Sequence, residues 1–464
     1  MLHRMASLTF VMTATGLLAA PPCFRRGAKK TKLMETLMQK HLAVPPSHSA
    51  VNVEVVTTAL GLVFWLVRSH AVPLVSLEFA IRGGAAQDPA KKAGLGALMA
   101  GLLDEGAGDL DSQAFQRALD EKAIEMSFHC DRDHWSGRMR TLVKNLDRAA
   151  ELLRLAIAAP RFDEEPFERV REQLNARLRH DANDPATVAG RAWKAKAFPH
   201  HPYGEPADGS LETLARIDRD DLMKAAKRGL ARDRLLVAVV GAIDEKAASA
   251  LVDTAFGGLP ERGELKPIAD AAFEGLGAIE TIDLDVPQST IRFGRPALRR
   301  DDPDFIASVV AAHVLGGSGN MTSRLFREVR EKRGLAYTVF GTFYSLEHGA
   351  YFYGGTTTKN ERARVAFDVA QAEIRDVALN GLSADELRKG KTYLIGSYPL
   401  RFDTSAKIAS QLIHIQLERR APEWLVERNR EIAAVTAKSV KRAAERAFGD
   451  GSLHTVVVGR PEGF

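Results

Sequence analysis

Two side chains in the second half of the chain, Arg330 and Tyr337, form a spaced pair of hydrogen-bond donors. They lie in the segment Gly316–Gly341, which reads GGSGNMTSRLFREVREKRGLAYTVFG. The glycine-rich opening of this segment predicts a turn. Thr322 or Ser323 could then cap a helix whose apolar residues recur with helical spacing.

The elements that position this pair can be predicted from the residues around Gly334. This glycine can adopt the left-handed conformation that closes a helix, and the basic pair Lys332–Arg333 just before it suits a helix C-terminus. The segment Leu335–Phe340 is rich in β-branched and aromatic residues and predicts a strand. Arg330 would therefore leave the last helical turn, and Tyr337 would enter the strand.

The string LFREVREKRGLAY resembles the signature of the C-terminal half of the pitrilysin-like zinc peptidases, the family that includes mitochondrial processing peptidase. In that family an arginine and a tyrosine seven positions apart reach a substrate held at a zinc site elsewhere. The resemblance implies this role for Arg330 and Tyr337, and a substrate-binding loop for Gly316, Gly317 and Gly319. An isolated pair at this spacing would more simply be a surface arginine and a half-buried strand tyrosine.

The same resemblance indicates where a metal should be, because catalytic members carry HxxEH on the first helix after a strand ending in glycine. Residues 92–105 predict that helix here. Ala97 and Gly101 stand in place of the two histidines, Ala100 in place of the glutamate base, and Gln173 in place of a later glutamate ligand. These residue types cannot form a zinc site. We therefore expect no cofactor in this chain, and zinc in a partner subunit.

Other histidines give weaker metal hypotheses. His200 and His201 are adjacent, so their rings should diverge in a loop, and they lie in a stretch that resembles a structural turn of the family. His129 and His134 flank a predicted turn. Structural or surface histidines are the favoured interpretation of all four.

An internal repeat predicts two copies of one domain. Ile217 matches Val435 and Gly241 matches Gly459, each with an offset of 218. Each copy mixes adjacent strands with long helices, which favours antiparallel or mixed sheets covered by helices. We expect an α+β fold with two homologous domains, each a mostly antiparallel sheet packed with helices. The resemblance implies that these domains are clasped around a cleft.

The predicted domain order begins with a signal-like segment and basic linker at residues 1–50. An N-terminal peptidase-like domain with the degenerate zinc motif follows at 51–265, and a C-terminal domain with the Arg/Tyr motif at 276–464. The run Met5–Ala20 has no charge and resembles a secretory signal, but it is short for a membrane span. We expect export to a periplasm; a cytoplasmic or membrane-anchored protein is the alternative.

Composition narrows the function classes. With 464 residues the chain needs more than one domain, and 45% apolar and 27% charged residues are ordinary for a globular protein. Residues 1–40 hold seven basic residues against Glu35, so the remaining 424 residues sum to −1 within the total of +5. A basic nucleic-acid face therefore has little support. Two distant cysteines, Cys23 and Cys130, make no disulfide framework, and Cys130 should be a lone buried thiol.

These observations predict a non-catalytic, substrate-binding subunit of a heterodimeric zinc metallopeptidase. A partner chain with an intact HxxEH motif would supply Zn²⁺ and the base, and this chain would add Arg330 and Tyr337 for peptide hydrolysis. The chain would be inactive alone. Two alternatives stay open: a purely structural scaffold, and a peptide-binding subunit without a catalytic contribution.

Overall fold

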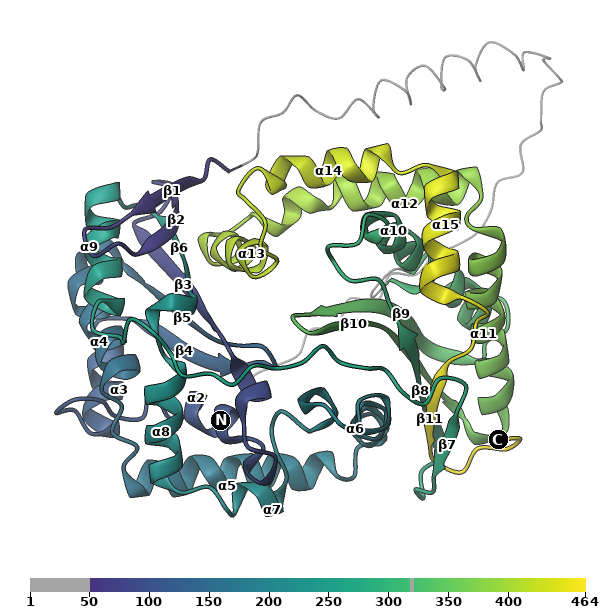
Figure 1. The fold of residues 1–464 in the computed structure, drawn as a ribbon, viewed down its shortest axis with the longest axis horizontal. Helices are drawn as coiled ribbons and strands as arrows, with labels where there is room; N and C mark the ends of the chain where they lie inside the picture. Colours follow the sequence, from purple (N-terminus) through teal and green to yellow (C-terminus); the bar gives the residue numbers. More distant parts are fainter. Residues whose placement is uncertain (1–50, 318–320) are drawn as a thin grey trace, which may run out of the picture. The chain divides into compact units, whose positions relative to one another are not determined.

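The two halves of the described chain each build a β-sheet covered by helices (Figure 1). The computed structural model describes residues 51–317 and 321–464. The predicted signal-like segment and linker, Cys23 and Gly319 lie outside these residues. Within the described ranges, no helix has both the length and the apolar composition to cross a membrane.

The sheet of the first half has the strand order β1-β2-β6-β3-β5-β4. Neighbouring strands are antiparallel except β2 and β6, which are parallel. The strands are β1 (Glu54–Thr57), β2 (Val63–Arg68), β3 (Leu74–Arg82), β4 (Glu125–Cys130), β5 (His134–Leu142) and β6 (Leu235–Gly241). The helices are α2 (Leu95–Ala100), α3 (Ser112–Asp120), α4 (Leu146–Ala158), α5 (Glu164–Asp181), α6 (Pro185–Ala197), α7 (Leu211–Leu214), α8 (Arg219–Gly229) and α9 (Glu245–Phe256).

The sheet of the second half has the order β7-β11-β8-β10-β9, and here β7 and β11 are the parallel pair. Its strands are β7 (Ile279–Ile282), β8 (Gln288–Pro296), β9 (Ala336–Leu346), β10 (Gly349–Lys359) and β11 (His454–Val458). Its helices are α10 (Phe305–Gly316), a π-helix labelled η6 (Phe326–Glu331), α11 (Ala363–Asn380), α12 (Ala384–Gly396), α13 (Ser405–Leu417), α14 (Trp424–Ala434) and α15 (Ala437–Phe448).

The repeat seen in the sequence corresponds to a structural repeat. Asp218 and Thr436 cap α8 and α15 with the same reciprocal capping box. Gly241 is the last residue of β6 and Gly459 directly follows β11, with φ angles of 150° and 134°, which favour glycine. The predicted α+β class with two mostly antiparallel sheets is confirmed. Residues 257–278 contain no helix or strand, and the predicted domain boundaries at 265 and 276 stay a prediction.

Each half buries its own apolar core between its sheet and its helices. In the first half α4 and α9 pack on each other and on the sheet, around side chains such as Phe79 and Phe256. In the second half α10, α11 and α15 do the same around Phe352 and Phe448. The opposite face of each sheet is free to receive another element.

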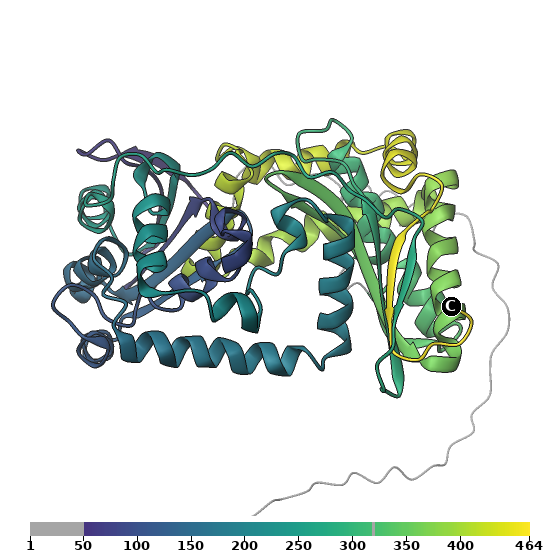
Figure 2. The same ribbon diagram turned by 60° about the horizontal axis from the view of Figure 1, so that its bottom comes forward.

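A helix from the other half occupies that opposite face. Helix α13 packs on β3 and β6 of the first sheet, and α6 packs on β8 and β11 of the second (Figures 1 and 2). Figure 2 shows how the long helix α5 leads across to α6. The α6 start is set by Pro185 at its first position and by Asp184, whose carboxylate accepts from Thr187 N at 2.8 Å. These two arrangements are called the α13 contact and the α6 contact below.

Candidate functional site

The structure brings the predicted pair together. The central carbon of the Arg330 guanidinium lies 4.3 Å from the ring centroid of Tyr337 and 4.8 Å from that of Phe326. Such stacking on aromatic faces fixes the orientation of a guanidinium. Tyr337 is 76% exposed. The pair therefore presents a phenol and an oriented cation on the surface of the second half.

The predicted helix before Tyr337 is confirmed in position but differs in type. Ser323 is its cap, since the Ser323 hydroxyl accepts from Phe326 N at 3.3 Å. From Phe326 to Glu331 the chain forms a π-helix, because its backbone bonds reach one residue further than in an α-helix, as Lys332 N donating to Arg327 O shows. Gly334 ends the segment with the predicted left-handed conformation, at a φ of 57°.

A buried carboxylate fastens this π-helix. Glu328 accepts from Lys332 Nζ and Arg333 Nη1, both at 2.7 Å, and from Arg327 Nε at 3.2 Å. The bond from Lys332, supported by Arg333 and Arg327, lowers the pKa of Glu328 to about 2. The carboxylate therefore stays charged over the working pH range and holds the turn that carries Arg330.

A β-bulge places Tyr337 at the start of β9. Thr338 lies opposite Thr357 of β10, whereas Ala336 lies opposite Thr358, so Tyr337 is the extra residue between two paired positions. A bulge of this kind redirects a side chain and ends regular pairing. The strand tyrosine of the prediction is therefore an exposed side chain at an irregularity of the strand.

Packing accounts for the glycines of the predicted substrate loop that the structure describes. A Cβ at Gly316 would lie 2.8 Å from Gly341 N, and one at Gly317 would lie 2.8 Å from His313 Nδ1. Only glycine fits such approaches without movement. Gly319 is outside the described residues, and the substrate-binding role of all three stays a prediction.

The residues at the would-be metal positions do not fit zinc. Helix α2 ends at Ala100, shorter than the predicted helix, so Gly101 follows its last residue and only Ala97 and Ala100 lie within it. A Cβ at Gly101 would lie 3.1 Å from Val170 of α5, and Gln173 on α5 is exposed. In the described ranges, no three His, Cys, Asp or Glu residues are arranged to hold a metal ion.

The histidine and cysteine predictions have simple structural outcomes. His201 Nε2 lies 2.9 Å from Ala269 O, and His201 Nδ1 accepts from Tyr203 N at 3.1 Å, so this histidine shapes a turn. Cys130 is a buried free thiol, as predicted. Burial raises the pKa of Cys130, which makes it a poor nucleophile.

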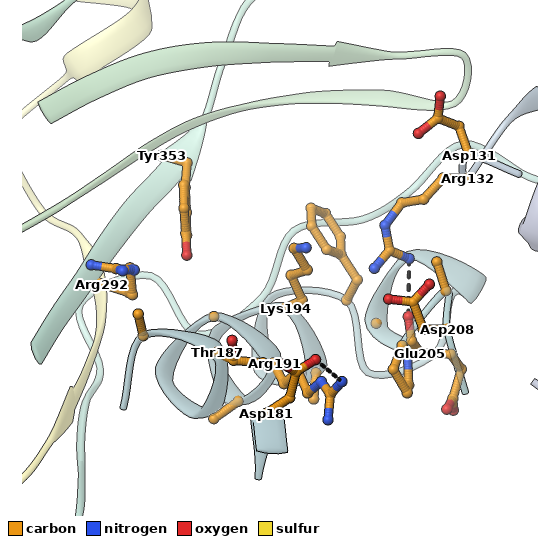
Figure 3. Close-up of a pocket in the computed structure, with 18 of the residues that line it drawn as sticks. Asp131, Arg132, Asp181, Thr187, Arg191, Lys194, Glu205, Asp208, Arg292 and Tyr353 are labelled. Atoms are coloured by element: carbon orange, nitrogen blue, oxygen red, sulfur yellow. Dashed lines mark hydrogen bonds and ion pairs between the residues drawn. The ribbon is translucent and has the colours of Figure 1, made fainter. Parts of the chain in front are cut away.

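A cavity of about 950 Å³ lies along the α6 contact (Figure 3). Arg292 on β8 and Tyr353 on β10 line it from the second sheet. Lys194 lines it from α6, and Arg132 from the turn between β4 and β5. Figure 3 shows Arg292 and Tyr353 on one side, Arg132 on the other and Lys194 between them. The cavity is thus built from both halves of the chain.

Burial dominates the electrostatics of this cavity. It lowers the pKa of Lys194 to about 8, and the nearby Arg132 guanidinium acts in the same direction. It also lowers the pKa of Arg132 and raises that of Tyr353. Lys194 and Arg132 are therefore charged near neutral pH at a cost in solvation, while Tyr353 keeps its proton.

The predicted pair and this cavity share β9 but are separate sites. Phe340, three residues after Tyr337, lines the cavity, whereas Arg330 and Tyr337 are not among its lining residues. Sequence reasoning did not single out the cavity. A usable signal was present in α6, where Arg191 and Lys194 are three residues apart and so share a helix face.

Comparison with known protein families gives a partial match. A family model described as the peptidase M16 inactive domain matches residues 216–394. Among characterised sequences, the chain is similar to the "Non-peptidase homolog YmxG" of Helicobacter pylori, with 27% identity over 341 residues. That alignment covers 72% of this chain and 77% of the relative.

Solved structures show the same fold. A crystal structure of a peptidase M16 inactive domain from Pseudomonas fluorescens matches with a TM-score of 0.83 and 24% identity, over 88% of this chain and 98% of that one. A chain of Complex III2 from Candida albicans matches with a TM-score of 0.72 and 16% identity, over 89% and 97%. Both carry the arrangement of two helix-covered sheets described above.

Proposed function

Because this chain belongs to the peptidase M16 family, we propose that it is a non-catalytic, substrate-binding subunit of a heterodimeric zinc metallopeptidase. A partner chain with an intact HxxEH motif would hold the metal and the general base. This chain would hold the peptide in the shared site. Residue types at Ala97, Ala100, Gly101 and Gln173 support the division of labour, since they cannot bind zinc or move a proton.

The observation that carries this proposal is the exposed, stacked pair of Arg330 and Tyr337. A tyrosine exposed to 76% at a bulge buries little apolar surface of its own, so packing alone gives a weak reason for its presence. A phenol can donate a hydrogen bond to a carbonyl oxygen as negative charge develops on it. A guanidinium can hold a neighbouring peptide carbonyl.

The partner's zinc would supply Lewis-acid polarisation of the scissile carbonyl and an activated water. Tyr337 would add a donor to the same oxygen from this chain. Arg330, fixed between Phe326 and Tyr337, would set the register of the bound peptide. The similarity to a chain of Complex III2 supports a place in an assembly, and the similarity to a non-peptidase homologue supports inactivity alone.

The test is Tyr337→Phe in the complex of this chain with its HxxEH partner. Loss of one such donor reduces turnover by roughly 10²–10³-fold, so cleavage should fall by that factor while assembly, measured by size-exclusion chromatography, is unchanged. Tyr344→Phe on the same strand is the matched control, because Tyr344 stacks on Tyr351 and lies away from the pair. Full cleavage by the Tyr337→Phe complex would remove the proposed role.

A scaffold would give a different result. Comparing peptide cleavage by the partner alone and by the complex separates the two functions, since a scaffold leaves turnover insensitive to Tyr337. A periplasmic location is part of the proposal and is supported by the uncharged run Met5–Ala20. Cell fractionation of the full chain tests it.

A further inference from the structure

The cavity at the α6 contact is lined by four cations and four carboxylates, and most of these carboxylates are paired with side chains other than Lys194, Arg132 and Arg292. Three of the lining carboxylates already have partners. Asp131 lies 3.4 Å from His129 Nε2 and 3.2 Å from His134 Nε2, so these two histidines have a structural partner at the turn. Asp181 pairs with Arg191 at 3.5 Å.

The third paired carboxylate, Asp208, lies 3.1 Å from Arg177 and its charge is shared with that side chain. Glu205, the remaining acidic lining residue, is exposed at the rim. The carboxylates around the cavity are thus either paired with side chains other than Lys194, Arg132 and Arg292 or open to water.

Three lining cations have no such partner within the described chain. Arg132 donates to two backbone carbonyls, Pro202 O at 3.2 Å and Glu205 O at 3.0 Å. Arg292 donates to Ile291 O at 3.3 Å and lies over the ring of Phe340 at 5.7 Å. The Lys194 side chain forms no hydrogen bond or ion pair with any described residue. Cations that are half-removed from water and have no directly paired carboxylate are costly unless a ligand provides one.

The neutral parts of the wall suit a peptide. Tyr353 directs its hydroxyl toward α6 between the cations (Figure 3), and the rings of Phe198 and Phe340 add apolar surface. A volume of about 950 Å³ is at the upper end of the roughly 300–1,000 Å³ typical of small-ligand sites. A short stretch of extended peptide with an anionic group fits this combination.

We propose that this cavity is a carboxylate-binding subsite for peptides, in which Lys194, Arg132 and Arg292 surround the anionic group and Tyr353 donates a hydrogen bond to it. The proposal extends the peptide-binding role proposed above by naming the substrate class. The carboxylate can come from a peptide C-terminus or from an Asp or Glu side chain. Because the site draws on both halves of the chain, a bound peptide would also bridge them.

The experiment measures binding of fluorescent octapeptides to the full chain by anisotropy. The first peptide has a free C-terminus and no acidic side chain, and its C-terminal amide serves as the neutral amide. The third peptide is the same amide with one internal glutamate. Carboxylate peptides should bind at least tenfold more tightly than the neutral amide, since hydrogen bonds to charged groups are the stronger class. Comparing the free C-terminus with the glutamate amide identifies the source of the carboxylate.

Lys194→Met and Arg292→Gln should each remove most of that preference, measured as the ratio of the affinities for carboxylate and neutral peptides. Lys196→Met is the matched control on α6, because Lys196 is exposed and does not line the cavity. Should Lys194→Met fail to fold, Arg292→Gln and the wild-type preference still decide the matter. Peptide binding without preference for a carboxylate overturns this subsite and leaves the peptide-binding role intact. Absence of binding by every peptide overturns both.

Discussion

The α13 contact and the α6 contact are counterparts in the repeat but differ in how they are filled. At the α13 contact, Leu412 and Ile413 pack against Trp65 and Val240 of the first sheet in a continuous apolar cluster. At the α6 contact, the aromatic cluster around Trp193 covers only part of the interface. The rest opens into the cavity with Lys194 and Arg292. Helix α13 covers its part of the first sheet with apolar side chains, whereas α6 leaves a cavity between itself and the second sheet.

This difference indicates that the packing of a helix on the sheet of the other half has a structural role at α13 and a functional role at α6. A dry apolar contact stabilises the association of the halves through buried area. A contact that contains a polar cavity buries less apolar area and is stabilised less by it. Binding of a ligand in the cavity would compensate for this loss. The chain therefore combines a dry, apolar contact at α13 with a contact at α6 that leaves a polar cavity, where the proposed peptide subsite would lie.

Trp193→Ala should give the largest loss of stability at these contacts. Trp193 is fully buried, its Nε1 donates to His454 O at 3.0 Å, and its ring lies 4.9 Å from that of Tyr353. Truncating a buried tryptophan costs about 3–5 kcal/mol, and the orphaned carbonyl adds to this. Urea unfolding followed by circular dichroism measures the change.

The counterpart substitution is Leu412→Ala, which should cost about 2–5 kcal/mol and less than Trp193→Ala, because no hydrogen bond is lost. A larger loss for Leu412→Ala would reverse the ranking and make the α13 contact the more tightly coupled one.

Local sequence signals predicted much of the fold. The strand pairs and the caps depend on neighbouring residues, and the repeat shows as two similar stretches 218 residues apart. The positions of Ser323 and Gly334 followed from capping and turn chemistry alone. Helices α6 and α13 each pack on the sheet of the other half. This packing is determined by contacts between residues more than 100 positions apart, such as Trp193 with His454. Helical periodicity carries no such information.

The site shows the same division. Arg330 and Tyr337 lie within one short segment and were identified as a pair by their spacing and by the family resemblance, whereas the stacking of the guanidinium on the phenol ring is seen only in the structure. The π-helix and the bulge that orient them were not foreseen, and the bulge depends on how β9 pairs with β10. The cavity joins Lys194, Arg132 and Arg292 from three separate segments, and each of these residues is an ordinary surface cation when considered alone.

The pH dependence of stability should distinguish the two contacts by sign. Burial raises the pKa of Glu78, which faces Ser410 of α13 as well as Arg138 and His134. The folded chain then holds this proton more tightly than the unfolded chain, so stability falls as pH rises from about 4.5 toward the raised value. Glu78→Gln should remove that fall and be at least as stable as the parent at pH 7.

Lys194 should behave in the opposite way. Its pKa is about 8 when folded, against 10.5 in the unfolded chain, because of burial and of Arg132 and Arg191, with only Asp208 opposing them. The cost is fully present below pH 8 and is relieved as pH rises from about 8 to about 10.5. Lys194→Met should remove that rise, as measured by thermal unfolding between pH 6 and pH 10. If the stability of Glu78→Gln and of Lys194→Met changed with pH at the same slope, the opposite signs assigned to the two contacts would be contradicted.

Gly190→Ala should have the smallest effect on stability and still alter the cavity. A Cβ at Gly190 would lie 3.2 Å from the Tyr353 hydroxyl, so the phenol must shift by a few tenths of an ångström. Alanine is favoured over glycine within a helix by about 0.5–1 kcal/mol, which offsets the tight contact and keeps the net change below about 1 kcal/mol. Gly396→Ala on α12 is the control, because a Cβ there meets no atom within 4 Å. If Tyr353 takes part in the subsite, Gly190→Ala should weaken binding of carboxylate peptides several-fold, while Gly396→Ala leaves that binding unchanged. Equal binding by both variants would show that the Tyr353 hydroxyl does not contact the anionic group.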